Sequence, residues 1–206
     1  MLIDPEIGMR PAPLKHNPFK ALVAPRPIGW ISTMSASGAV NLAPFSYFNA
    51  VADSPPCVMF CPNGTKPDGS LKDSLLNVQE TGEFVFNIAT WATREQMNAT
   101  SAHEPRSVDE MAKAGLTAIP SVKVKPPRVK ESPVHFECRL IQTVQMPTGK
   151  HGEPNYVVFG QVIAVHISEE VVTDGLVDYR KLRPIARLGY MDYCVVDEHF
   201  SMQRPA

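Results

Sequence analysis

Alternation of apolar and polar residues is clearest in the C-terminal half of the chain. From residue 134 to 140, apolar side chains recur at every second position, and residues 134–146 predict a long strand with one face toward a core. The polar turn PTGKHGEP separates this run from a returning strand at residues 155–167. In the first strand we expect Val134, Phe136, Cys138 and Leu140 to face inward, and His135, Glu137 and Arg139 to face outward.

A second strand pair is predicted at residues 24–49. Two β-prone runs, residues 27–34 and 40–49, flank the polar turn Ser-Ala-Ser-Gly, whose glycine can adopt a positive φ. Residues 57–61 form a wholly apolar run that we expect to be buried on both faces. Residues 83–89 alternate again and predict a further strand.

Three segments carry the start and stop signals of helices. The first, residues 70–81, has Ser70 as its predicted N-cap and ends before Gly82. The other two, residues 91–101 and 108–114, begin at the spacing of a capping box. The pairs that predict these boxes are Thr93 with Gln96 and Ser107 with Glu110.

The remaining segments lack a clear period. Residues 1–18 are rich in proline and predict an extended arm, and residues 119–132 predict an irregular crossing segment. Residues 172–182 predict a loop, and residues 187–196 a last short strand. Many strands with few helices between them favour an antiparallel β-barrel with peripheral helices. We therefore expect one mostly β domain at 19–206, preceded by the arm.

Composition and charge exclude several classes of function. A net charge of −1 over 206 residues gives no electrostatic basis for binding nucleic acid. The chain has no apolar run of the ~18–20 residues that a membrane helix needs, and no secretory signal pattern. Its 4 cysteines are scattered, and its histidines show no metal-ligand spacing. We expect a cytoplasmic protein without a metal site, a disulfide framework or a GxGxxG nucleotide loop.

The N-terminal hairpin carries more polar chemistry than a core hairpin needs. Arg26 lies between two prolines, the first strand ends in a Ser-Thr pair, and Asn41, Ser46 and Asn49 punctuate the second. Such groups between aromatic residues suit a flat ligand with a polar edge and an anionic group. A solvated hairpin face explains the same residues equally well, so the chemistry alone leaves both interpretations open.

Several motifs, in order along the chain, make the sequence resemble the flavin reductase-like family of FMN-binding split barrels. They are RPIGWIST, NLAPFSYFN, SPPCVMF, KDSLLNVQETGEFVFNI, SVDEMAKAGL and RPIARLGYMDY. This resemblance implies a split β-barrel, FMN as cofactor, and a homodimer with the flavin in a groove at the two-fold interface. Tyr190 stands where many relatives have a second glycine, which could narrow access to the ring.

The resemblance also implies which residues contact the flavin. It places Arg26, Ser32 and Thr33 toward the phosphate end, and Asn41, Ala43, Pro44, Ser46 and Asn49 along the isoalloxazine. The flavin or its phosphate is also contacted by Lys72, Asp73, Ser74 and Asn77, and the pocket is bordered by Arg187, Gly189 and Tyr193. From physics alone, Lys72 is either a solvated lysine or a cation beside free N–H groups at a helix start.

The function implied is an FMN-dependent oxidoreductase that takes hydride from NAD(P)H. Hydride passes directly from nicotinamide to flavin, so the protein supplies positioning and exclusion of water, and we expect no catalytic side chain. Two alternatives share the flavin contacts. One is a non-catalytic, flavoredoxin-like electron carrier, and the other is a flavin-dependent oxygenase of small molecules on the same scaffold. No motif separates NADH from NADPH.

Overall fold

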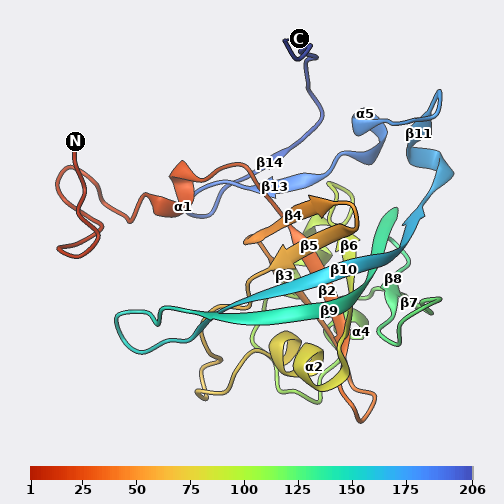
Figure 1. Cartoon of the computed structure of the whole chain (residues 1–206), viewed down its shortest axis with the longest axis horizontal. Helices are drawn as coiled ribbons and strands as arrows, with labels where there is room; N and C mark the ends of the chain where they lie inside the picture. The colour runs from red at the N-terminus through yellow and green to blue at the C-terminus, as the bar shows by residue number, and fades with distance from the viewer. Residues whose placement is uncertain (206) are drawn as a thin grey trace.

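Seven antiparallel strands form the main sheet of the computed structural model, which describes residues 1–205 (Figure 1). Their order across the sheet is β3-β2-β6-β9-β10-β5-β4. The two end strands, β3 and β4, are separated by only two residues of chain, so the sheet must curl until its ends meet. No ladder joins β3 to β4 in the part of the chain described, so the barrel is split there. The bounds are β2 Gly29–Met34, β3 Val40–Phe45, β4 Phe48–Asp53, β5 Pro56–Phe60, β6 Glu83–Ile88, β9 Val134–Met146 and β10 Asn155–Ile167.

The predicted strand pairs are confirmed, except that one predicted strand is divided into two. Strands β9 and β10 have the predicted bounds and pair along their whole length. In the N-terminal hairpin, β2 pairs with β3 from Gly29↔Phe45 to Met34↔Val40, and Gly38 in the turn has a φ of 91°. The predicted second strand at 40–49 is two strands, because the chain bends at residues 46–47 as it passes from one end of the sheet to the other.

An apolar core fills the barrel. Side chains from the inner faces of the strands meet there, and α2 (Asp73–Thr81) closes one end with Leu75 and Val78. The fully buried rings of Phe60 and Phe84 lie edge to face, with centroids 5.2 Å apart. The inward phase predicted for β9 is confirmed for Cys138, which belongs to this core together with its cross-strand partner Phe84 of β6.

A second core lies outside the barrel against β2. Successive residues of β2 alternate between the two cores, with Ile31 in the barrel and Trp30 outside it. The outer core is covered by α3 (Arg94–Ala99) and α4 (Glu110–Lys113), which contribute Met97 and Met111. Strand β2 is therefore buried on both faces and anchors the whole N-terminal hairpin.

On the outward face of β9, Arg139 is exposed, but the other two residues predicted to face outward are covered by another part of the chain. His135 and Glu137 are buried because the crossing segment, residues 119–132, lies over β6 and β9. The Glu137 carboxylate accepts hydrogen bonds from the N–H groups of Val122 (2.8 Å) and Lys123 (2.6 Å) and from Nε2 of His166 (2.6 Å). This segment is mostly irregular, as predicted, apart from the short pair β7 (Ala118–Ile119) and β8 (Arg128–Val129).

Helix starts differ from the predicted caps. Helix α2 begins three residues after Ser70, with Lys72 as an N-cap residue that makes no side-chain cap, while Ser70 bonds Asp68. Neither predicted capping box forms. Thr93 bonds the N–H of Thr90, and in α4 the cap is Asp109, which accepts from Ala112 N at 3.1 Å. The C-terminal glycines, Gly82 and Gly115, have the expected positive φ of 71° and 70°.

Short elements complete the chain. A three-stranded sheet contains β1 (Arg26–Pro27), β13 (Ile185–Arg187) and β14 (Tyr193–Val195), so the predicted last strand is two strands with a turn between them. The predicted loop at 172–182 contains β11 (Val172–Thr173), β12 (Leu176–Val177) and α5 (Tyr179–Leu182), preceded by η1 (Glu169–Val171). Residues 1–18 contain no helix or strand and precede α1 (Phe19–Leu22).

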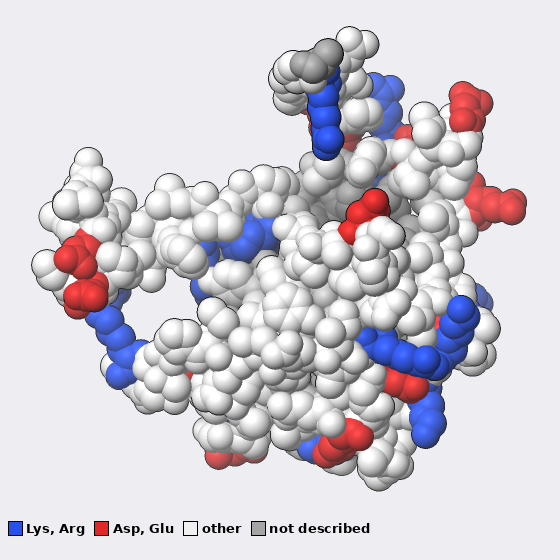
Figure 2. Space-filling model, viewed as in Figure 1, with Lys and Arg blue, Asp and Glu red and all other residues white. Residues whose placement is uncertain are grey.

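Charge is dispersed on the face shown in Figure 2, where basic and acidic side chains lie scattered over a largely uncharged surface. The N-terminal arm and the tip of the β9–β10 hairpin extend from the same side of the barrel in Figure 1, and Lys150 reaches the carbonyl of Glu6 there. Among residues 1–205, none of the helices has the length and apolar character needed to span a membrane.

Candidate functional site

A polar cavity of about 170 Å³ lies beside β3, the end strand of the sheet. We call it the β3 cavity. Five segments build its walls: β3, the loop between β5 and α2, the start of α2, the residues that follow α3, and α4. Its lining residues are Asn41, Ala43, Pro44, Phe45, Lys66, Lys72, Asp73, Ser74, Thr100, Ser101, Ala102, His103, Glu104 and Glu110.

The start of α2 gives this cavity its cationic character. The first N–H groups of a helix have no intrahelical partner, and the N-cap residue Lys72 leaves them without a side-chain cap. The Lys72 ammonium lies 3.4 Å from Nδ1 of His103. Burial, and then the nearby positive charge of Lys66, lower the pKa of Lys72. An anion that enters the cavity therefore meets a partly desolvated lysine and free backbone donors.

The other charged groups of the cavity are largely compensated. Lys66 pairs with Asp73 at 2.9 Å, and both side chains are almost fully buried. Glu104 pairs with Lys113 at 2.5 Å. Glu110 is buried and accepts from Leu42 N at 3.1 Å, and burial raises the pKa of its carboxyl to about 6 despite that hydrogen bond. Lys72 is thus the lining cation whose charge is available to a ligand.

A hydrogen-bond network behind the cavity holds its wall in place. Asn41 Nδ2 donates to Ser74 Oγ at 2.8 Å, which joins β3 to α2. Thr33 Oγ1 accepts from Asn77 Nδ2 at 3.0 Å, and Arg106 Nη2 donates to Asn77 Oδ1 at 3.0 Å. Thr33 and Asn77, both predicted as flavin contacts, therefore lie behind the lining residues and position them.

Six of the predicted residues line the β3 cavity together: Asn41, Ala43, Pro44, Lys72, Asp73 and Ser74. Ser32 points to the other side of β2, where its hydroxyl donates to Pro127 O at 2.6 Å. Ser46 lies where the chain crosses from β3 to β4, and Asn49 lies in β4, where its amide oxygen accepts from Ala50 N at 2.9 Å. The cavity is therefore lined by β3 itself, up to its last residue Phe45, and not by the residues directly after it.

The structure places Arg26 away from the cavity. Its guanidinium is buried and donates to the carbonyls of Lys20, Val23 (2.5 Å) and Leu188 (2.8 Å). The arginine therefore joins the segment before β1 to the turn between β13 and β14. Gly189, in that turn, packs so closely on Ala21 that a Cβ would have no room.

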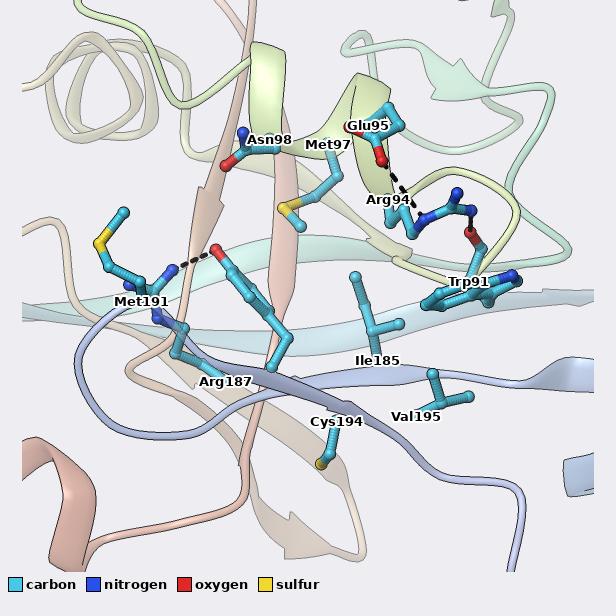
Figure 3. A pocket seen from close by; sticks show the side chains of 11 residues that line it. Trp91, Arg94, Glu95, Met97, Asn98, Ile185, Arg187, Met191, Cys194 and Val195 are labelled. Atoms are coloured by element: carbon cyan, nitrogen blue, oxygen red, sulfur yellow. Dashed lines mark hydrogen bonds and ion pairs between the residues drawn. The ribbon is translucent and has the colours of Figure 1, made fainter.

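Arg187 and Tyr193 line a different cavity of about 300 Å³, which we call the α3 cavity (Figure 3). It lies between α3 and the β13–β14 pair. Its remaining lining residues are Trp91, Arg94, Glu95, Met97, Asn98, Ile185, Met191, Cys194 and Val195.

Sequence reasoning missed residues 100–104, Lys66 and Glu110. Thr100 and Ser101 fall at the end of the helix predicted over 91–101, but Thr100 Oγ1 accepts from the buried Trp30 Nε1 at 2.9 Å, which fixes this segment against the hairpin. Glu110 was assigned to a capping box. The available signal was the polar run TSAHE directly after a helix, which has no apolar period of its own.

The fold and the site define a split antiparallel barrel whose end strand carries a cavity suited to an anion. Comparison with known proteins identifies its family. Residues 22–186 match the model of the flavin reductase like domain. An uncharacterized protein of Aquifex aeolicus is 43% identical over 169 residues, covering 82% of this chain and 83% of that protein. The chain belongs to the flavin reductase-like family.

Solved structures agree with this assignment. Nitrilotriacetate monooxygenase component B from Bacillus cereus superposes with a TM-score of 0.85 at 29% identity, covering 98% of both chains. Flavoredoxin of Desulfovibrio vulgaris superposes with a TM-score of 0.74 at 21% identity, covering 87% of this chain and 89% of that one, and shares the fold. The predicted fold class is confirmed.

Proposed function

We propose that this protein is an FMN-dependent oxidoreductase that accepts hydride from NAD(P)H, and that the FMN phosphate binds in the β3 cavity. One observation carries the proposal: Lys72, the uncapped N-terminus of α2 and the Ser74 hydroxyl converge on one cavity. A phosphomonoester needs this combination of a cation and several donors. Membership of the flavin reductase-like family supplies the reason to choose a flavin.

The size of the β3 cavity fits only one end of FMN. Pockets that enclose a drug-sized ligand measure roughly 300–1,000 Å³, whereas this one measures about 170 Å³. The phosphate would occupy the cavity, and the tricyclic ring would lie outside it along β3. A ring left in water would be poorly protected, so we also propose that a second copy of the chain covers it in a homodimer.

The chain's own residues bind and orient the cofactor, which supplies hydride acceptance when bound. Lys72 and the α2 N–H groups would hold the phosphate, and Asn41 would keep Ser74 directed toward it through their 2.8 Å hydrogen bond. Ala43, with its small side chain, leaves the cavity open beside the β3 backbone. We propose no side-chain acid or base in the hydride step, because direct transfer needs none.

Titration of the purified protein with FMN tests the site. We expect Lys72→Ala to weaken FMN binding about tenfold or more, because a charge-assisted contact to phosphate is lost. Lys181→Ala is the matched control, since Lys181 is exposed, lies outside the β3 cavity, and its ammonium donates to the carbonyl of Val172. Equal FMN affinity for the two variants, or no binding by the wild type, would contradict the proposed site.

Anaerobic absorption spectra test the reaction. Addition of NADH or NADPH to the FMN-loaded protein should bleach the flavin absorption. Bound FMN that neither nucleotide reduces, but that a protein donor reduces, would contradict the reductase and support the flavoredoxin-like carrier. Sedimentation measures the assembly separately, and a monomer at micromolar concentration would contradict the homodimer.

A further inference from the structure

The α3 cavity has the features of a ligand site of its own. Its volume of about 300 Å³ is at the lower end of the range for small-molecule pockets. Met97, Ile185 and Val195 give it an apolar lining, and Trp91 and Tyr193 contribute aromatic rings (Figure 3). Helix α3 separates it from the β3 cavity, because Met97 lines one cavity while Thr100, just after the helix, lines the other.

Positive charge exceeds negative charge around this cavity. Arg94 stacks 3.9 Å from the centre of the Trp91 ring and contacts Glu95, its acidic neighbour, at 3.4 Å. At the opposite end of the view in Figure 3, the Arg187 guanidinium lies 4.4 Å from the Tyr193 ring centre and donates to the Tyr193 hydroxyl. Among residues 1–205, no carboxylate pairs with Arg187.

We propose that the α3 cavity binds a single-ring aromatic carboxylate, with the ring in the apolar part and the carboxylate on Arg187. Aromatic and apolar walls hold a planar ring, and one uncompensated guanidinium matches one negative charge. The volume suits a ligand of one ring. This proposal concerns a second site and does not depend on flavin binding in the β3 cavity.

Tryptophan fluorescence offers a direct test with benzoate as the probe. The chain has 2 tryptophans, and Trp30 is fully buried whereas Trp91 is 42% exposed at the cavity. We expect benzoate to change the emission of the wild type in a saturable way and to leave Trp91→Phe silent. Calorimetry should still detect binding to Trp91→Phe, because phenylalanine keeps an aromatic wall.

Charge recognition is tested by paired ligands and paired variants. Benzyl alcohol, which lacks the carboxylate, should bind about fivefold or more weakly than benzoate. Arg187→Gln should weaken benzoate binding by a similar factor, while Arg139→Gln, an exposed arginine on β9, should not. Thermal melts establish whether Arg187→Gln is folded, and Arg187→Lys keeps the charge if it is not.

Alkylation of Cys194 gives an independent readout. Cys194 is a half-buried free thiol in the cavity lining, and Cys61 is a half-buried free thiol outside it. Benzoate should slow alkylation of Cys194 and leave Cys61 unchanged. No saturable benzoate signal, equal affinity for benzyl alcohol, tighter binding of AMP than of benzoate, or unchanged affinity in folded Arg187→Gln would each overturn the proposal. All measurements use the protein without added FMN, so a failed flavin site leaves them interpretable.

Discussion

The two faces of the β6–β9 strand pair are both buried, but they are held in different ways. The barrel face is apolar, with Phe84 and Cys138 packed in the core. The outer face carries Asn87, His135 and Glu137, which bond the backbone of the crossing segment. Packing of apolar side chains stabilises the first face, and hydrogen bonds to the crossing segment stabilise the second. The crossing segment has few strand hydrogen bonds of its own, and side chains from the sheet beneath it therefore hold it in place.

Removing a ring from the barrel face should have the largest effect. Phe84 is fully buried and contacts the Phe60 ring. We expect Phe84→Ala to lower the free energy of unfolding by about 3–5 kcal/mol, from lost burial and the cavity left behind. Urea denaturation measures it, with the half-exposed Phe19→Ala as control. A loss similar to that of the control would mean that the barrel face is not held by packing.

Removing the carboxylate of the outer face should cost somewhat less. Glu137→Ala leaves the N–H groups of Val122 and Lys123 without their acceptor, and we expect a loss of about 3 kcal/mol. Glu83→Ala is the matched control, because its exposed carboxylate also accepts from the crossing segment, at Lys125 N. An equal loss of stability in both variants would contradict the expectation that burial makes the Glu137 hydrogen bonds more important than those of Glu83.

Acid should weaken the outer face before it affects the barrel face. Burial lowers the pKa of His135 to about 4, from an ordinary value of 6.5. The unfolded chain then binds the proton more readily, so the stabilisation is present above pH 6.5 and is lost as the pH falls toward 4, by up to about 3 kcal/mol. His135→Gln should flatten this part of the profile. An unchanged slope between these pH values would contradict the assignment.

The smallest expected effect is that of Ser32→Ala, which tests whether Ser32 contributes to stability or to FMN binding. Ser32 was predicted to contact the flavin, but its hydroxyl donates to Pro127 O on the outer side of β2. Ser32→Ala should cost about 1 kcal/mol of stability and leave FMN affinity unchanged. A loss of FMN affinity comparable to that of Lys72→Ala would return Ser32 to the binding site.

Many of the strands could be predicted from the sequence, because the alternation of apolar residues and the choice of turn residues depend on neighbouring positions. The bounds of β9 and β10 and the inward phase of β9 followed from alternation and from the turn at 147–154. The burial of His135 and Glu137 could not be predicted, because it depends on where a distant irregular segment lies. The predicted capping box of α4 does not form for a related reason, because the Glu110 carboxylate accepts from Leu42 N of β3 instead of bonding within its own helix.

The residues of the candidate site also fall into those that local motifs identify and those that depend on distant contacts. Asn41 and Lys72 belong to recognisable motifs, and the structure brings them to one cavity. Residues 100–104 complete its wall through a contact between Thr100 and Trp30 that spans the fold and leaves no local pattern. Arg26 lies in a motif as clear as any, yet its guanidinium is directed at backbone carbonyls, because a motif specifies residue types and not their partners.

The three carbonyls around Arg26 limit how this position can change over evolutionary time. Its planar guanidinium serves acceptors in two segments that are far apart in the chain, Val23 and Leu188 among them. A lysine presents a single compact charge and cannot satisfy acceptors spread in this way. Arg26→Lys would therefore leave carbonyls without their donors, so this position does not tolerate the Arg-to-Lys exchange that exposed positions accept.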